Sequence, residues 1–111
     1  MTLNHIHLGV HDLDAAVVWF KKIMQIDPGF QNENIATFSF GSLTLILDRA
    51  GEDVPATVGF ESHDCDGDLR TVVNRGAVIL EPPNDKEWGV RTAYFKGPGK
   101  LKFEIEGPVR K

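Results

Sequence analysis

Near the start of the chain stands the stretch LNHIHLGVHDLDAAVVWF (Leu3–Phe20), whose layout occurs again in PATVGFESHDCDGDLRTV (Pro55–Val72). Each copy is typical of a short strand, a turn and the start of a helix, and His-Asp-x-Asp occupies the turn in both. Two copies of one unit in a small chain are expected to bury their apolar faces together. The sequence therefore predicts a symmetric pair of modules, in which His5 corresponds to Thr57.

The composition of the chain narrows the classes of protein to consider. A length of 111 residues suits one domain, 1–111, with a real core. Apolar residues make up 41% and charged residues 25%, as in ordinary soluble globular proteins. The net charge of −4, and the lack of a Lys/Arg cluster outside residues 110–111, argue against nucleic-acid binding.

Location is predicted from the same residues. The sequence has no signal-peptide pattern at its start and no apolar run that approaches a membrane span. The single Cys65 cannot form an internal disulfide, which fits a reducing compartment. We therefore expect a cytoplasmic protein without a membrane partner.

The first module, about residues 1–50, is predicted from the spacing of its apolar residues. Its expected elements are a strand at 3–10, a helix after the N-cap Asp12 that Asp27-Pro28-Gly29 ends, and a hairpin of strands 35–40 and 43–48 around Gly41-Ser42. In the first strand, Ile6 and its even-numbered neighbours face the helix, because successive strand residues point to opposite sides. His5 and His7 therefore lie on the other face.

The second module, about residues 55–108, repeats this order. Its expected elements are a strand containing Val58 and Phe60, a helix at 66–75 after the N-cap Asp64, a short strand at 77–80, and a hairpin of strands 91–96 and 101–106 around Gly97–Lys100. Alternation turns Leu101, Phe103 and Ile105 toward the helices and Glu104 away from them. Tyr94 suits either the core or the lining of a groove.

Three features of the chain resemble the vicinal oxygen chelate superfamily, which includes glyoxalase I, extradiol dioxygenases, and the fosfomycin and bleomycin resistance proteins. They are the opening NHIHLGVHDLDAAVVWFKKIM, the closing EPPNDKEWGVRTAYFKGPGKLKFEIEGP (Glu81–Pro108), and the repeat. The resemblance implies an α+β fold of two βαβββ-type modules, whose curved mixed sheets surround a cleft. It also implies a homodimer, because a second subunit commonly completes that cleft. Gly97–Lys100 departs from the pattern, because it lacks the usual acidic turn.

The resemblance also implies where a metal would bind. Enzymes of the superfamily hold a divalent metal with up to four side chains, and two of those positions match His5 and Glu104. Alignment of the two hairpins and of the repeat places Ile46 and Thr57 at the other two, where neither can serve as a strong ligand. We therefore expect either no cofactor or a weakly held Zn, Ni, Mn or Fe ion, with His7 as an added ligand. The alternative is a metal-free hydrogen bond between His5 and Glu104.

Trp88 and Arg91 are further candidate ligand contacts. In binding members of the superfamily, the segment that contains them borders the ligand groove. Trp88 would stack on a planar ligand, while Arg91 would pair with a carboxylate or phosphate. The alternative is that Trp88 packs over the sheet edge and Arg91 forms a salt bridge with a nearby Glu.

Two functions follow, of which a binding protein is favoured. It would sequester a bulky or aromatic small molecule in a dimer groove, as the bleomycin resistance proteins do. The expected ligand contacts are His5, His7, Ile46, Thr57, Trp88, Arg91 and Glu104. The alternative is a metal-dependent lyase of the lactoylglutathione lyase type, an isomerase or a dioxygenase, in which Glu104 is catalytic. A protein-interaction module is a third class, which no exposed motif supports.

Overall fold

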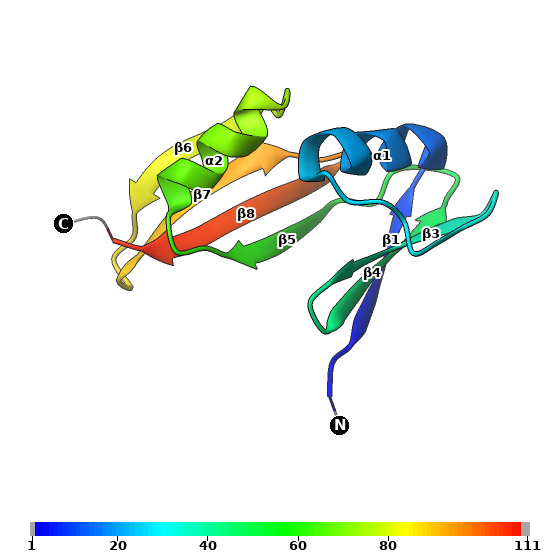
Figure 1. Ribbon diagram of the computed structural model, residues 1–111, viewed down its shortest axis with the longest axis horizontal. Coiled ribbons are helices and arrows are strands. Elements are labelled where there is room, and N and C mark those ends of the chain that lie inside the picture. The colour runs from blue at the N-terminus through cyan, green and yellow to red at the C-terminus, as the bar shows by residue number, and fades with distance from the viewer. Residues whose placement is uncertain (1, 110–111) are drawn as a thin grey trace. The chain divides into compact units, whose positions relative to one another are not determined.

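The structure is a computed structural model that describes residues 2–109 (Figure 1). The chain forms two compact units. Within the described residues, the first unit comprises 2–55 with 98–100, and the second comprises 56–97 with 101–109. Each unit is a βαβββ module with a four-stranded mixed sheet, which confirms the α+β class and the paired modules. No helix in residues 2–109 is long and apolar enough to cross a lipid bilayer.

The sheet of the first unit has the strand order β1-β4-β3-β2. Its strands are β1 (His5–Val10), β2 (Phe30–Gln31), β3 (Ile35–Phe40) and β4 (Leu43–Arg49). β1 runs parallel to β4, and the other pairs are antiparallel. The predicted hairpin is confirmed, and Gly41 supplies the positive φ of +62° that its turn requires.

The helix of the first unit begins where the sequence predicts and ends earlier. The Asp12 side chain accepts a hydrogen bond from the Ala15 backbone N–H at 3.0 Å, so the predicted N-cap of α1 (Leu13–Trp19) is confirmed. The helix continues as a wider π-helical turn, η1 (Phe20–Met24). It ends at Gln25 (φ 52°), where the Ile26 N–H bonds back to the Phe20 carbonyl at 3.3 Å. This closure occurs before the predicted stop at Asp27-Pro28-Gly29.

The core of the first unit lies between this helix and one face of the sheet. Phe20 stacks on Phe38 with ring centroids 4.4 Å apart, and both side chains are fully buried. Leu45 and Leu47 are buried as predicted, whereas His5 and His7 are exposed. The remaining buried apolar residues of this unit are Val10, Leu13, Ala16, Val17, Ile23 and Ala36.

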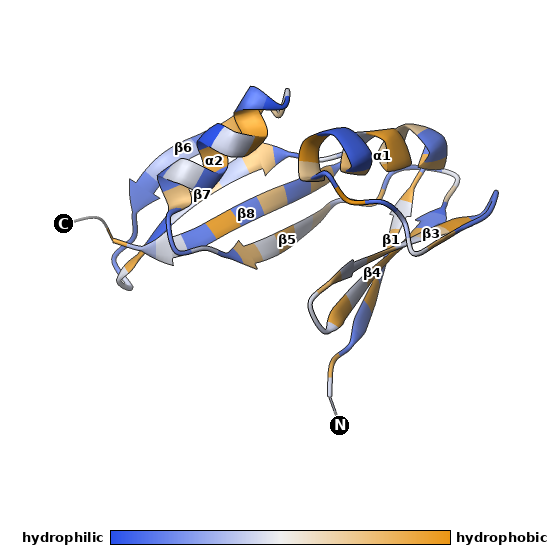
Figure 2. Ribbon diagram, viewed as in Figure 1, coloured by the Kyte–Doolittle hydropathy of each residue, from blue (hydrophilic) through white to orange (hydrophobic). Residues whose placement is uncertain are grey.

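The sheet of the second unit has the equivalent order β5-β8-β7-β6. Its elements are β5 (Ala56–Glu61), α2 (Cys65–Asn74), β6 (Ile79–Asp85), β7 (Val90–Lys96) and β8 (Leu101–Pro108). α2 packs against β7 and β8, and apolar and polar residues alternate along β8 (Figure 2). Leu101, Phe103 and Ile105 are buried beneath α2, as predicted. Cys65 is buried with them, and burial followed by the charge of Asp66 raises the pKa of its thiol.

The short strand predicted at 77–80 is present, but its predicted bounds are wrong. The strand is β6, which starts at Ile79 and runs through Pro82 and Pro83 to Asp85, with register shifts against β7. Proline has no backbone N–H to donate, which bars it from central strands but not from an edge. β6 is the edge strand of its sheet, so only one side of its backbone needs a partner.

The strand registers confirm how the two modules correspond. In the first sheet His5 lies beside Thr44, and in the second Thr57 lies beside Lys102, in parallel pairs of the same kind. Two residues further on, Ile46 and Glu104 therefore occupy equivalent positions. The equivalence of Ile46 with Glu104 was the one expected from the sequence.

Candidate functional site

The candidate site lies on the outer face of the second sheet, defined as the side opposite α2. Tyr94 of β7 lies directly beside Glu104 of β8 in the antiparallel register, so both side chains project from this face. The Tyr94 hydroxyl donates a short hydrogen bond to Oε2 of Glu104. The Nζ atom of Lys102 lies 4.9 Å from the centre of the Tyr94 ring. An aromatic ring, a carboxylate and an ammonium group therefore form one cluster.

The carboxylates near Tyr94 hold its hydroxyl in the protonated form. Its hydrogen bond to Glu104 raises the pKa of Tyr94 to about 12, assisted by burial and by the negative charges of Glu104, Glu81 and Glu106. Ionised tyrosine would lose the hydrogen bond and be repelled by these charges. At neutral pH Tyr94 is therefore a neutral donor fixed in place by Glu104.

Gly59 provides the space that the Glu104 side chain occupies. The two residues are neighbours in the parallel pair of β5 and β8. A Cβ atom added at Gly59 would lie 3.4 Å from Oε1 of Glu104. One carboxylate oxygen of Glu104 therefore faces Tyr94 and the other lies over Gly59, with Thr57 exposed two residues earlier on β5.

His5, His7 and Ile46 belong to the first unit. Nδ1–H of His7 donates to Oδ2 of Asp48 at 2.8 Å, and Nδ1–H of His5 donates to Oδ1 of Asn4 at 2.6 Å. The two imidazole rings meet edge to face, with centroids 5.6 Å apart. Ile46 lies beside His7 in the parallel register. The structure thus brings these three candidates together on the face of the first sheet opposite α1.

The expected metal ligands do not form a complete donor set within either unit. His5 belongs to the first unit and Glu104 to the second, where Oε2 of Glu104 already accepts the Tyr94 hydroxyl. Across residues 2–109, no three His, Cys, Asp or Glu side chains are grouped as a metal site requires. Binding of a metal by His5 and Glu104 stays a prediction.

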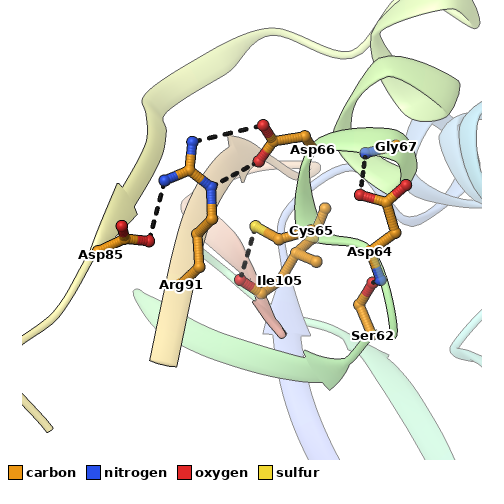
Figure 3. Close-up of polar contacts among 8 residues, drawn as sticks. All are labelled: Ser62, Asp64, Cys65, Asp66, Gly67, Asp85, Arg91 and Ile105. Atoms are coloured by element: carbon orange, nitrogen blue, oxygen red, sulfur yellow. Dashed lines mark hydrogen bonds and ion pairs between the residues drawn. The ribbon is translucent and has the colours of Figure 1, made fainter. Parts of the chain in front are cut away.

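Arg91 projects from the opposite face of β7, toward α2 (Figure 3). Its Nε donates to Oδ1 of Asp66 at 2.7 Å and its second terminal nitrogen to Oδ2 of the same residue at 3.4 Å. The remaining terminal nitrogen donates to Oδ1 of Asp85 at 2.9 Å. These hydrogen bonds raise the pKa of Arg91 above its ordinary value. Arg91 therefore joins α2 to β6 through two aspartates, where the sequence suggested a Glu; its role toward a ligand stays a prediction.

Trp88 lies between β6 and β7 with 71% of its surface exposed. It precedes Gly89, whose φ of +92° allows the chain to turn into β7. Such exposure does not match the alternative in which Trp88 packs over the sheet edge. The stacking of Trp88 on a ligand stays a prediction.

Tyr94 is the member of the site to which the sequence assigned no definite role. The position of the hairpin turn at Gly97–Lys100 would have predicted that Tyr94 lies beside Glu104. Counting outward from this turn pairs Lys96 with Lys102 and then Tyr94 with Glu104, as the structure shows. Alternation along β7 does not show on which face Tyr94 lies. Residues 92 and 93 are both buried although successive strand residues point to opposite faces.

Comparison with known proteins identifies the fold. The chain is similar to a glyoxalase/bleomycin resistance protein/dioxygenase from Nocardioides, with a TM-score of 0.84, 22% identity and coverage of 99% of this chain and 85% of that one. For a superfamily member from Sphaerobacter thermophilus DSM 20745 the TM-score is 0.80, at 17% identity and 96% and 97% coverage. For a lactoylglutathione lyase from Agrobacterium tumefaciens it is 0.82, at 15% identity and 96% and 92% coverage. No protein-family model and no curated protein matches the sequence.

These structural neighbours extend over nearly the whole chain and confirm the resemblance seen in the sequence at the level of the fold. The chain has the glyoxalase/bleomycin resistance/dioxygenase fold. Identities of 15–22% do not transfer the activity of any of these proteins.

Proposed function

We propose that this protein binds a bulky or aromatic small molecule and sequesters it, with the outer face of the second sheet as its central contact surface. The observation that supports this proposal is the hydrogen-bonded pair of Tyr94 and Glu104. An aromatic ring held rigidly on a sheet offers a stacking surface at little entropic cost. The carboxylate beside it offers a hydrogen-bond acceptor.

The same pair favours binding over metal-dependent catalysis. Glu104 is the carboxylate that would ligate a metal, and the Tyr94 hydroxyl already occupies one of its oxygens. Its equivalent in the first unit is Ile46, which has no ligating atom, and the equivalent of His5 is Thr57. We include Thr57 and Glu104 in the ligand surface of the second unit. Ligand contacts by His5, His7 and Ile46 of the first unit, and by Trp88 and Arg91 away from this surface, stay separate predictions.

The proposed assembly is a homodimer in the cytoplasm, with the small molecule as its partner. The dimer is inferred from the superfamily resemblance, in which a second subunit completes the groove. The cytoplasmic location is inferred from the single Cys65, which cannot form an internal disulfide and is buried.

A nuclear magnetic resonance titration tests the binding site. ¹⁵N-labelled protein would be titrated with three planar probes: a cationic acridine dye, an anionic anilinonaphthalene sulfonate and a flavin. We expect at least one probe to shift the amide signals of Thr57, Tyr94 and Glu104. Tyr94→Ala should weaken that probe roughly tenfold, because the stacking ring is lost. Arg70→Gln, a change at an exposed residue of α2, is the matched control and should leave the affinity unchanged.

Two results would contradict this function. One is an NMR titration in which no probe shifts these signals, or in which Tyr94→Ala and Arg70→Gln change the affinity for the probe equally. The other comes from elemental analysis of protein purified without a chelator. Near-stoichiometric metal that His5→Ala abolishes would favour the metal-dependent lyase, isomerase or dioxygenase instead.

A further inference from the structure

Thr92 buries a hydroxyl group that has no partner. The residue is only 2% exposed, and among residues 2–109 its Oγ1 is the one buried side-chain oxygen or nitrogen without a hydrogen bond. Valine would fill the same space without burying a polar atom, and buried polar groups are normally paired. Thr92 therefore carries a buried hydrogen-bonding group that no other group in the described part of the chain satisfies.

Thr92 is also one of the residues that line an open hollow in the second unit. The hollow has a volume of about 400 Å³, within the range of small-molecule sites. Its walls come from the irregular part of β6, where the register against β7 shifts between Ile79 and Glu81 and again between Glu81 and Asn84, the interval that contains the two prolines. The lining residues are Glu81, Pro82, Pro83, Asn84, Lys86 and Thr92. Thr92 is the buried member of this set, since the others are exposed or half-buried.

The hollow offers a carboxylate and an ammonium group at once. Glu81 and Lys86 both line it, and neither forms an ion pair with another residue in the described part of the chain. Asn84 lies beside Thr92 in the register, and its amide adds a donor and an acceptor to the lining. The proline rings supply the apolar part of the wall.

We infer that this hollow is a second binding site, for a short zwitterion such as a dipeptide. The ammonium group of the ligand pairs with Glu81, its carboxylate pairs with Lys86, and a central peptide group bonds to the Thr92 hydroxyl. This assignment goes beyond the proposed function, because the site needs neither the Tyr94 ring nor a metal. It uses only residues of the second unit.

The test is a titration of the full chain with L-alanyl-L-alanine, followed by ¹⁵N amide shifts. We expect shifts at Asn84, Lys86 and Thr92. N-acetyl-alanyl-alanine lacks the ammonium group and alanyl-alanine amide lacks the carboxylate, so both should bind more weakly. Lys86→Met should weaken the zwitterion but leave the affinity for the amide unchanged.

Two variants of Thr92 separate the hydroxyl from the fold. Thr92→Val removes the hydroxyl and keeps the shape, and should weaken the dipeptide roughly threefold to tenfold, as expected for one hydrogen bond. Thr92→Ser keeps the hydroxyl and should retain the affinity. The amide spectrum of each free variant confirms that it is folded.

Three outcomes would overturn the assignment: no shift at these amides, equal binding of all three peptides, or unchanged affinity in Thr92→Val. The aromatic probes are scored on Thr57, Tyr94 and Glu104, so failure of the dipeptide site leaves their result untouched. Equally, if no aromatic probe binds, the dipeptide titration scored on Asn84, Lys86 and Thr92 still tests the second site.

Discussion

At the scale of single residues, the outer face of the second sheet depends on Tyr94. The hydrogen bond to Glu104 fixes both side chains, and the ammonium of Lys102 lies over the ring. The tyrosine is thus a rigid neutral surface among carboxylates. These properties suit recognition of a ligand better than proton transfer near neutral pH, since an acid whose pKa is far above the ambient pH releases its proton poorly.

The titration of Tyr94 tests this description. The chain contains one tyrosine, so tyrosinate absorbance reports Tyr94 alone. We expect a pKa of about 12 in the folded protein, against the ordinary value of 10.0. Because the folded state raises this pKa, the stabilisation is fully present below pH 10 and is lost as the pH rises through about 12.

Variants of two glutamates provide the comparison. Glu104→Ala should bring the pKa of Tyr94 down toward its ordinary value, because the carboxylate that accepts the hydroxyl is removed. Glu87→Gln removes a carboxylate of the same unit that has no part in the shift, and should leave the titration unchanged. A wild-type pKa near 10 would show that the Tyr94–Glu104 bond does not persist in solution.

At the scale of elements, Arg91 is the joint between α2 and β6. Its guanidinium group holds Asp66 in the first turn of the helix and Asp85 at the end of the edge strand. A planar group with several donors suits two carboxylates at once, which a lysine ammonium matches less well. Arg91 therefore fixes the C-terminal end of β6, the strand that lines the proposed dipeptide site, to the first turn of α2.

The end of the first helix yields a stability prediction. Gln25 adopts a left-handed conformation, with φ of 52°, which is strained for a residue with a side chain. Gln25→Gly should raise the free energy of unfolding by roughly 0.5–1 kcal/mol, after allowing for the greater freedom of glycine in the unfolded chain. Urea unfolding measures the change.

Gln25→Ala is the control, because alanine keeps the strain and should bring no gain. Destabilisation by Gln25→Gly would mean that the glutamine side chain contributes interactions that outweigh its backbone strain.

At the scale of the whole molecule, assembly is the property to test. We expect sedimentation equilibrium to give about twice the chain mass of 12.3 kDa. A stretch at the start of the edge strand β6 is a suitable contact, since Val78, Ile79 and Leu80 are 59%, 44% and 45% exposed. Exposed apolar side chains beside a strand edge favour association.

A charge placed in this stretch would locate the contact. Ile79→Lys should shift the protein toward monomer, because the ammonium group would have to be buried in the interface. Val18→Lys, at an exposed apolar position of α1, should leave the mass unchanged. A monomeric wild-type protein would refute the dimer, and a monomer produced only by Val18→Lys would move the contact to the first unit.

Most of the fold was predictable from the sequence because it depends on short-range chain geometry. Alternation along β4 and β8 assigned the buried and exposed faces correctly, and Asp12 and Asp64 cap their helices as expected. The repeat predicted the two modules, and alignment of the two hairpins through Gly41 and Gly99 predicted the equivalence of Ile46 with Glu104. The alternation and the caps need only residues within one element, and the repeat and the hairpin alignment need only a comparison of short segments of the sequence.

The remaining features depend on which elements lie side by side. The strand predicted at 77–80 stops short of Pro82 and Pro83, and only the edge position of β6 makes a strand with two prolines possible. Arg91 and Asp66 are 25 residues apart in the chain, so no local pattern could pair them. That the Thr92 hydroxyl has no partner is likewise evident only in the folded sheet, because whether a polar group is satisfied depends on every strand packed around it.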